Sequence, residues 1–275
     1  MADSETALVL LGTGNPNPDP DCMGPALAIV AGGRVYLVDA GPGVIRRAAL
    51  AGIPMTHLTR AFITHLHSDH TAGLPDLFLT PAVVGRAEPL ELYGPRGLRA
   101  MTRHLLAAYK QDITIRTRGL EHGNPAGYTV NAHEVTRGEI YRDDAVRVVA
   151  FRVQHGAWQH AYGYRFETAD KTIVVSGDTT YSRTLIAAAR GCDILVHEVY
   201  CEKGWAKRTP DWQAYHAAYH TSAPQLGQLA TKVGAKKLVL VHQLTMGEPP
   251  AQIVEEISAH YSGEIIYGQD LDLIT

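Results

Sequence analysis

Cysteine is scarce in this sequence. Among 275 residues there are three cysteines, and they lie far apart, at Cys22, Cys192 and Cys201. A disulfide framework or a cysteine zinc site needs more cysteines at short, regular spacing. Both are therefore excluded. At this length, with 45% hydrophobic residues, the chain is able to bury a full hydrophobic core.

Long apolar runs and a basic N-terminal segment are also missing. The apolar run Ala7 to Leu11 ends at Gly12, and the segment Met1 to Thr6 contains no Lys or Arg. A membrane-spanning helix needs roughly 20 apolar residues, and a signal peptide begins with a basic segment. We expect neither, and we expect a cytoplasmic protein without a membrane partner.

Neither sign of charge is in surplus. Lys and Arg number 25 against 28 Asp and Glu, which gives a net charge of −3. Broad nucleic-acid-binding surfaces carry an excess of Lys and Arg, so nucleic acid is not expected as a substrate. A homodimer remains open.

The length fits one large α/β domain, and the sequence shows no linker, low-complexity tract or obvious repeat. We predict a single domain over residues 1–275. Within it, residues 117–144 are broken by Gly119, Gly123, Pro125 and Gly127. This stretch is therefore predicted to be a loop or hairpin insertion.

The most informative stretch follows a predicted strand at 61–64. Four potential metal ligands come within six residues, at His65, His67, Asp69 and His70. Side chains two apart on an extended segment point the same way, so His65 and His67 are predicted to converge. Neutral imidazole and carboxylate suit zinc, and also manganese or iron. Clustered His and Asp at a strand end indicate a metal site.

Other predicted strands end in the same kinds of residue. His155 follows a strand at 146–153, Asp178 follows one at 172–175, and His242 follows one at 238–241. Ligands gather at strand ends in α/β sheets, so residues far apart in sequence are able to converge there. We predict a two-metal site, with His65, His67 and His155 on one metal, Asp69, His70 and His242 on the other, and Asp178 between them. Asp39 is either a carboxylate that orients a ligand histidine or a helix N-cap or turn carboxylate.

An aromatic stretch from Trp205 to Tyr219 admits two interpretations. It contains Trp205, Trp212, Tyr215 and Tyr219. These rings are predicted either to line a substrate pocket or to pack in the core of the protein.

Taken together, these pieces resemble the metallo-β-lactamase superfamily and, within it, the ribonuclease Z and arylsulfatase-like branch. The resemblance runs over nearly the whole chain and includes two narrower signatures, Val196-His-Glu198 and His220-Thr-Ser-Ala223. It implies an α/β fold, an αβ/βα four-layer sandwich with two central mixed sheets flanked by helices, and two Zn²⁺ ions. By the same resemblance, Glu198 and His220 are the pair that orients and donates a proton to the leaving group. The residues implied in catalysis are Asp69, Asp178, Glu198 and His220.

The sequence also departs from this branch. Ribonuclease Z enzymes have a long glycine- and proline-rich arm after the third-motif histidine, whereas only a short segment separates His155 from Asp178. We therefore expect a dinuclear-metal hydrolase acting on a small phosphodiester, sulfate ester or related ester. The alternatives are transfer-RNA 3′ processing, hydrolysis of a lactone or carboxyl ester, and metal binding without turnover.

Overall fold

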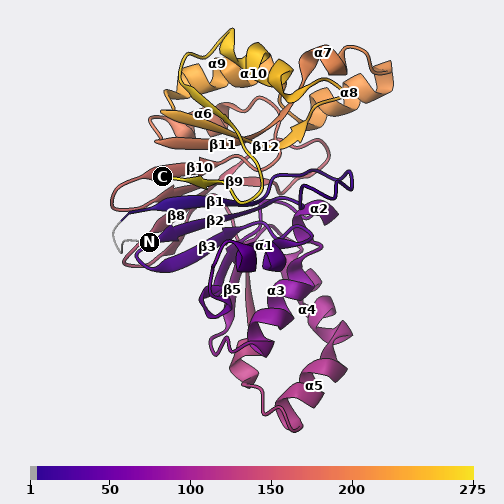
Figure 1. The fold of residues 1–275 in the computed structure, drawn as a ribbon, viewed down its shortest axis with the longest axis vertical. Coiled ribbons are helices and arrows are strands. Elements are labelled where there is room, and N and C mark those ends of the chain that lie inside the picture. Colours follow the sequence, from indigo (N-terminus) through magenta and orange to yellow (C-terminus); the bar gives the residue numbers. More distant parts are fainter. Residues whose placement is uncertain (1–4) are drawn as a thin grey trace. The chain divides into compact units, whose positions relative to one another are not determined.

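The structure is a computed structural model that describes residues 5–275, so part of the N-terminal segment discussed above lies outside it. The chain divides into two compact units, each containing one seven-stranded sheet. Unit 1 comprises residues 1–135 and 269–275, and unit 2 comprises residues 136–268. Figure 1 labels the helices and strands of both units.

The sheet of unit 1 has the order β14-β1-β2-β3-β4-β5-β6. The pairs from β14 to β3 are antiparallel and those from β3 to β6 are parallel, so the sheet is mixed. Its strands are β1 (Ala7–Gly12), β2 (Ala26–Ala31), β3 (Arg34–Val38), β4 (Arg60–Phe62), β5 (Leu90–Gly94), β6 (Val130–Glu134) and β14 (Leu273–Ile274).

A hairpin joins β2 and β3 at Gly32 and Gly33. Strands β2 and β3 pair antiparallel up to Ala31 and Arg34, which leaves a two-residue turn. Both glycines have positive φ, 54° and 73°, as a tight turn between twisted strands requires.

Helices pack against one face of this sheet. Apolar residues of α1 (Val44–Leu50), α3 (Leu74–Val83) and α4 (Leu98–Ala108) share a core with β1 to β5. Helix α5 (Lys110–Arg118) follows α4 almost directly and has no buried residue. The short helices are α2 (Ser68–Thr71), η1 (Met55–His57) and η2 (Pro125–Tyr128).

The side chain of Asp270 forms hydrogen bonds with the loop that follows β1. Its Oδ1 accepts hydrogen bonds from the backbone N and the Oγ1 of Thr13, at 2.8 and 2.9 Å. Its Oδ2 accepts one from the backbone N of Met23 at 2.9 Å and lies 3.1 Å from Nε of Arg47. Residues near the two ends of the chain are thus tied together within unit 1.

The sheet of unit 2 has the order β13-β12-β11-β10-β9-β8-β7. The pairs from β7 to β10 are antiparallel and those from β10 to β13 are parallel, which repeats the topology of unit 1. Its strands are β7 (Gly138–Arg142), β8 (Arg147–Arg152), β9 (Tyr162–Glu167), β10 (Thr172–Val175), β11 (Ile194–Tyr200), β12 (Lys237–Leu244) and β13 (Glu264–Tyr267).

Three helices bury apolar residues against the sheet of unit 2. They are α6 (Arg183–Ala189), α9 (Ala223–Val233) and α10 (Pro250–Ser258), which share a core with β8, β10, β11 and β12. Two further helices, α7 (Glu202–Trp205) and α8 (Pro210–Tyr219), follow β11. The predicted fold class is confirmed, because each unit is a mixed seven-stranded sheet accompanied by helices.

The segment 117–144 was predicted to be a loop or hairpin insertion, and its two strands do not form a hairpin with each other. The two strands of this segment, β6 and β7, pair with β5 and β8 and therefore belong to different sheets. The glycines that suggested a local turn instead lie in the loop after α5 and in η2. None of the helices formed by residues 5–275 is both long and apolar enough to cross a membrane.

A buried arginine braces unit 1. The side chain of Arg86 is fully buried and donates hydrogen bonds to four backbone carbonyl oxygens, those of Leu58, Leu77, Phe78 and Gly127. Pro81, inside α3, has no N–H and therefore cannot donate the helical hydrogen bond to the carbonyl oxygen of Leu77. Nη1 of Arg86 donates to that oxygen instead, at 3.0 Å. Burial lowers the pKa of Arg86 to about 10.

Replacing this arginine should destabilise unit 1. In Arg86→Leu the buried carbonyl oxygens lose their donors, and each unsatisfied group costs about 1–3 kcal/mol. We expect the free energy of unfolding, measured by urea titration, to fall by about 3 kcal/mol or more. The control is Arg103→Leu on α4, where the side chain is exposed. Equal stability of the two variants would contradict this role.

Candidate metal and proton-transfer site

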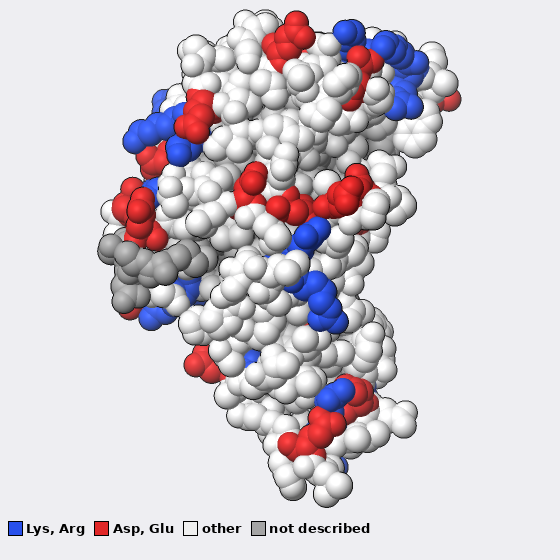
Figure 2. Space-filling model, viewed as in Figure 1, with Lys and Arg blue, Asp and Glu red and all other residues white. Residues whose placement is uncertain are grey.

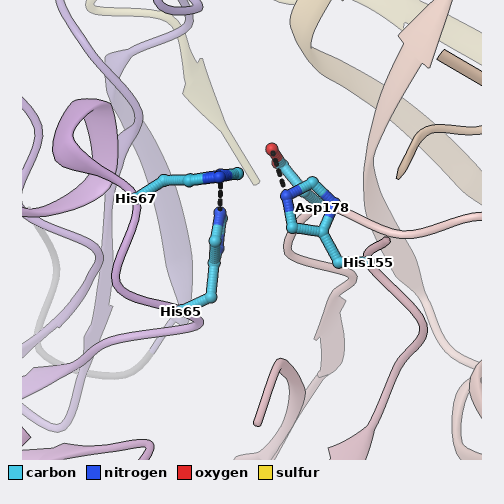
Figure 3. Close-up of side chains that lie close together, drawn as sticks. All are labelled: His65, His67, His155 and Asp178. Atoms are coloured by element: carbon cyan, nitrogen blue, oxygen red, sulfur yellow. Dashed lines mark hydrogen bonds and ion pairs between the residues drawn. The ribbon is translucent and has the colours of Figure 1, made fainter. Parts of the chain in front are cut away.

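The histidine cluster of unit 1 lies where the chain leaves β4. His65 and His67 precede α2, and Nε2 of His65 lies 2.9 Å from Nδ1 of His67 (Figure 3). Asp69 and His70 are in α2, where Nε2 of His70 lies 3.5 Å from Oδ2 of Asp69. Two pairs of donor atoms are therefore formed within unit 1, as the sequence pattern predicted.

Asp39 organises this cluster from the end of β3. It has a positive φ of 61°, which is uncommon outside glycine and typical of functional sites. Its Oδ2 lies 2.8 Å from Nδ1 of His70, and its Oδ1 accepts a hydrogen bond from the backbone N of Thr64 at 2.8 Å. Of the two interpretations of Asp39, the contact with His70 favours the carboxylate that orients a histidine.

The hydrogen bonds of Thr64 fix the tautomer of His65. Oγ1 of Thr64 lies 2.9 Å from Oδ2 of Asp39 and 3.1 Å from Nδ1 of His65. The carboxylate is an acceptor only, so the single hydroxyl proton goes to Asp39 and His65 Nδ1 must be the donor to Oγ1. Nε2 of His65 then carries a lone pair. The same argument applies to His70, whose Nδ1 donates to Asp39.

Glycines let the backbone approach this turn closely. A Cβ atom on Gly41 would lie 2.6 Å from the carbonyl oxygen of Asp69, and one on Gly24 would lie 2.9 Å from it. The backbone N of Ala40 also donates to the carbonyl of His70 at 2.9 Å. The turn that carries the ligand candidates is therefore held by main-chain packing.

In unit 2, His155 and Asp178 occupy loops that follow β8 and β10. Nε2 of His155 lies 3.9 Å from Oδ2 of Asp178 (Figure 3). Nδ1 of His155 donates to the carbonyl oxygen of Tyr219 at 2.8 Å, which leaves the lone pair on Nε2. Both side chains are buried.

His242 lies at an irregularity of β12. The register between β11 and β12 shifts there, because Glu198 pairs with Val241 whereas Val199 pairs with Gln243. His242 is the extra residue and has a positive φ of 48°. A bulge of this kind redirects a side chain, and Nε2 of His242 lies 3.4 Å from Oδ2 of Asp178.

Glu198 and His220 form a buried pair in unit 2. Nδ1 of His220 donates to Oε2 of Glu198 at 3.2 Å, and Oε1 accepts a hydrogen bond from the backbone N of Thr221 at 2.8 Å. Burial and the negative charge of Asp178 raise the pKa of Glu198 to about 8. Divalent cations bound beside Asp178 would oppose the second cause and favour the ionised carboxylate that accepts from His220. A ring nitrogen of His220 belongs to a group of donor atoms, with Asp178 and His242, that lie within 4.8 Å of one another.

The distances in both units suit metal coordination. Two ligand atoms at 2.0–2.1 Å from one cation lie about 2.9–3.4 Å apart for angles between 90° and 110°. The pairs His65–His67, Asp69–His70 and Asp178–His242 are separated by 2.9, 3.5 and 3.4 Å. These donors are neutral imidazoles and carboxylates, so the residues of each unit fit a divalent cation.

Sequence reasoning missed the residues that orient the ligands. Thr64 holds both Asp39 and His65, and the carbonyl of Tyr219 holds His155. The position of Thr64, directly before the first histidine, is a usable signal because strand-end hydroxyls often bond to neighbouring polar groups. A backbone carbonyl such as that of Tyr219 leaves no sequence signal.

Known proteins resemble this chain over most of its length. A family model described as "Beta-lactamase superfamily domain" matches residues 34–243. The chain is 37% identical over 241 residues to a protein named Ribonuclease Z from Mycobacterium sp. (strain KMS), covering 86% of this chain and 84% of that protein. It is 33% identical over 274 residues to Ribonuclease Z of Mycobacterium bovis (strain BCG / Pasteur 1173P2), covering 96% of each.

Solved structures show the same fold. The metallo-beta-lactamase fold protein YhfI from Bacillus subtilis has a TM-score of 0.76 at 18% identity, covering 98% of each chain. The short form of human tRNase Z has a TM-score of 0.72 at 22% identity, also covering 98% of each chain. The chain therefore belongs to the metallo-β-lactamase superfamily of hydrolases, in its ribonuclease Z-like branch. Membership implies that the chain binds divalent metal.

The contacts of Asp39 predict an effect on metal affinity. Asp39→Asn removes the carboxylate that favours the proton on Nδ1 of His70, so Nε2 becomes a poorer ligand. Loss of such a partner typically costs 10- to 100-fold in metal affinity. We expect a loss of about this size for zinc, measured by competition with a chelator. The control is Asp76→Asn on α3, and unchanged affinity in Asp39→Asn would show that Asp39 serves only the turn.

Proposed function

We propose that this protein is a two-metal phosphodiesterase acting on a small phosphodiester. One cation would be held by His65, His67 and His155, the other by Asp69, His70 and His242, with Asp178 between them. Such cations, when bound, acidify a water molecule and neutralise charge on the phosphoryl oxygens. The names of the relatives favour a phosphodiester over the sulfate esters, carboxyl esters and lactones that the sequence left open.

The observation that carries the proposal is the buried pair of Glu198 and His220. Because Glu198 accepts the hydrogen bond from Nδ1, the other nitrogen of His220 is available to the substrate. His220 contributes a ring nitrogen to the same donor group as Asp178 and His242, so a proton on its imidazole would be near a phosphodiester bound there. His220 would donate this proton to the departing oxygen. Asp178 would orient the attacking water by accepting one of its hydrogen bonds.

The metal assignment predicts the effect of removing ligands. His67→Ala and Asp178→Ala should each abolish phosphodiester hydrolysis, because the cations lose donors on which the reaction depends. Both should bind less than the two equivalents of zinc that we expect for the unaltered protein, measured by elemental analysis. Exhaustive chelation should abolish activity, and added zinc or manganese should restore it. Full activity in a metal-free preparation would refute the mechanism.

Proton donation by His220 predicts a dependence on the leaving group. His220→Ala should lose about 10²- to 10⁴-fold in rate on an alkyl phosphodiester, because an alkoxide needs the proton to depart. The loss should be much smaller on a nitrophenyl phosphodiester, whose nitrophenolate departs without it. Glu198→Gln should follow the same trend more mildly.

Metal content separates this role from the alternatives. It should be unchanged in His220→Ala, because His220 is assigned to neither cation. Equal losses on the two substrates, or loss of metal with activity, would make His220 a ligand or a structural residue instead.

Transfer-RNA 3′ processing is the second candidate, and the relatives named Ribonuclease Z favour it. Their name weighs against our expectation that nucleic acid is not a substrate. Two features favour the small phosphodiester. Within the described chain, only a short loop, β9, β10 and the turn between them separate His155 from Asp178, and the chain has no basic surplus.

Binding of precursor transfer RNA tests this choice. Affinity for a phosphate backbone comes mainly from Lys and Arg contacts and falls steeply with salt. We expect weak binding with a shallow salt dependence, measured by filter binding between 50 and about 200 mM salt. Tight, salt-sensitive binding together with cleavage at the 3′ trailer would establish the second candidate.

A further inference from the structure

Helix α8 carries an aromatic stripe that does not serve the core. Trp212, Tyr215, His216 and Tyr219 have the i, i+3, i+4, i+7 spacing that places side chains on one helix face. None of the ten residues of α8 is buried, and the side chains of Trp212 and Tyr215 are 55% and 40% exposed. Core packing, one of the two interpretations left open by the sequence, is therefore wrong for this helix.

The rings of the stripe touch one another and lead to the proton donor. Tyr215 stacks on Tyr219 with a centroid distance of 4.5 Å, and Trp212 meets Tyr215 edge to face at 5.5 Å. The ring of Tyr215 lies 6.5 Å from that of His220, which ends the helix. His220 in turn stacks on His242 at 5.5 Å. A continuous series of rings thus runs within unit 2 from an exposed tryptophan to the proposed acid.

A cavity lies at the inner end of the stripe. It has a volume of about 540 Å³, and Trp158, Tyr219 and His155 are among its lining residues. The ring of Tyr219 meets His155 edge to face at 5.0 Å, so one wall of the cavity is the last ring of the stripe. Figure 2 shows Lys and Arg side chains together with acidic side chains over α7 and α8. Lys207 of this region is exposed and forms an ion pair with Glu248. The charge near the rings is therefore mixed, and the rings themselves are the feature that a ligand would contact.

We propose that Trp212 and Tyr215 form a subsite for the leaving group, which binds a planar aromatic or heteroaromatic ring. This inference rests on the proposed function, because His220 protonates the oxygen that departs with that ring. Flat rings bind favourably on exposed aromatic faces, whereas saturated rings of equal size gain less from stacking. The substrate is accordingly a phosphodiester whose leaving alcohol carries a flat ring, either a simple aryl group or the base of a nucleoside.

The test compares leaving groups that differ in planarity and little else. A benzyl and a cyclohexylmethyl phosphodiester release alcohols of similar acidity and size, and a thymidine ester distinguishes a nucleobase from a simple aryl ring. We expect kcat/KM for benzyl to exceed that for cyclohexylmethyl by about 3- to 10-fold in the unaltered enzyme. The ratio should fall towards one in Tyr215→Ala and in Trp212→Ala, and Tyr215→Phe should restore it because the ring is kept.

A matched control is available on another helix. Tyr109, which follows α4, is 41% exposed, so Tyr109→Ala removes an equally exposed ring remote in sequence from α8 and should leave the ratio unchanged. A ratio near one in the unaltered enzyme, or an unchanged ratio in both α8 variants, would overturn the proposal. So would a change in oligomeric mass with an unchanged ratio, because the stripe would then be an interface between copies.

Binding without turnover separates the two proposals. Benzylphosphonate and cyclohexylmethylphosphonate are not hydrolysed, and their Kd values can be measured by calorimetry on the metal-loaded protein. Tighter binding of benzylphosphonate that disappears in Tyr215→Ala supports the ring subsite even if no phosphodiester is hydrolysed. Hydrolysis with equal Kd values for the two phosphonates would leave the proposed function standing and refute the subsite.

Discussion

The arrangement of the candidate site depends on hydrogen bonds that fix one nitrogen of each imidazole. Nδ1 of His70 faces Asp39, Nδ1 of His155 faces the carbonyl of Tyr219, and Nδ1 of His220 faces Glu198. In each case the hydrogen bond to Nδ1 fixes the orientation of the ring, so the direction of the lone pair or proton on Nε2 is fixed as well. A histidine without such a partner would sample both tautomers and several rotamers, so these contacts give the donors their chemistry before any ion binds.

The two units use the same strand topology to place acidic residues. In each sheet a carboxylate follows the fourth strand from the antiparallel edge, Asp39 after β3 and Asp178 after β10. Each of these aspartates lies within 4 Å of histidine nitrogens in its own unit. The sequence shows no obvious repeat that would announce this shared topology.

Much of the fold was predictable from the sequence, since buried strands appear as short β-branched runs and helices as periodic ones. The failures have physical causes. Strands β6 and β7 look like a hairpin because they are adjacent in sequence, yet pairing partners are decided by contacts far along the chain. The bulge at His242 was equally hidden, because it arises from the register between β11 and β12. The spacing of the aromatic residues in α8 identifies which of them share a helix face. It does not indicate whether that face is buried in the core or exposed to solvent.

The contacts of Asp270 have a consequence for synthesis. Unit 2 is continuous in sequence, whereas unit 1 consists of residues 1–135 and the final segment 269–275. Strand β14 and Asp270 belong to that final segment. Strand β14 pairs with β1 at the edge of the sheet, and Asp270 accepts hydrogen bonds from the backbone N atoms of Thr13 and Met23. Domains fold as they leave the ribosome, N-terminal parts first. Here the first half to be translated remains one strand short until residues 269–275 have left the ribosome, so unit 2 has the opportunity to fold before the unit that precedes it.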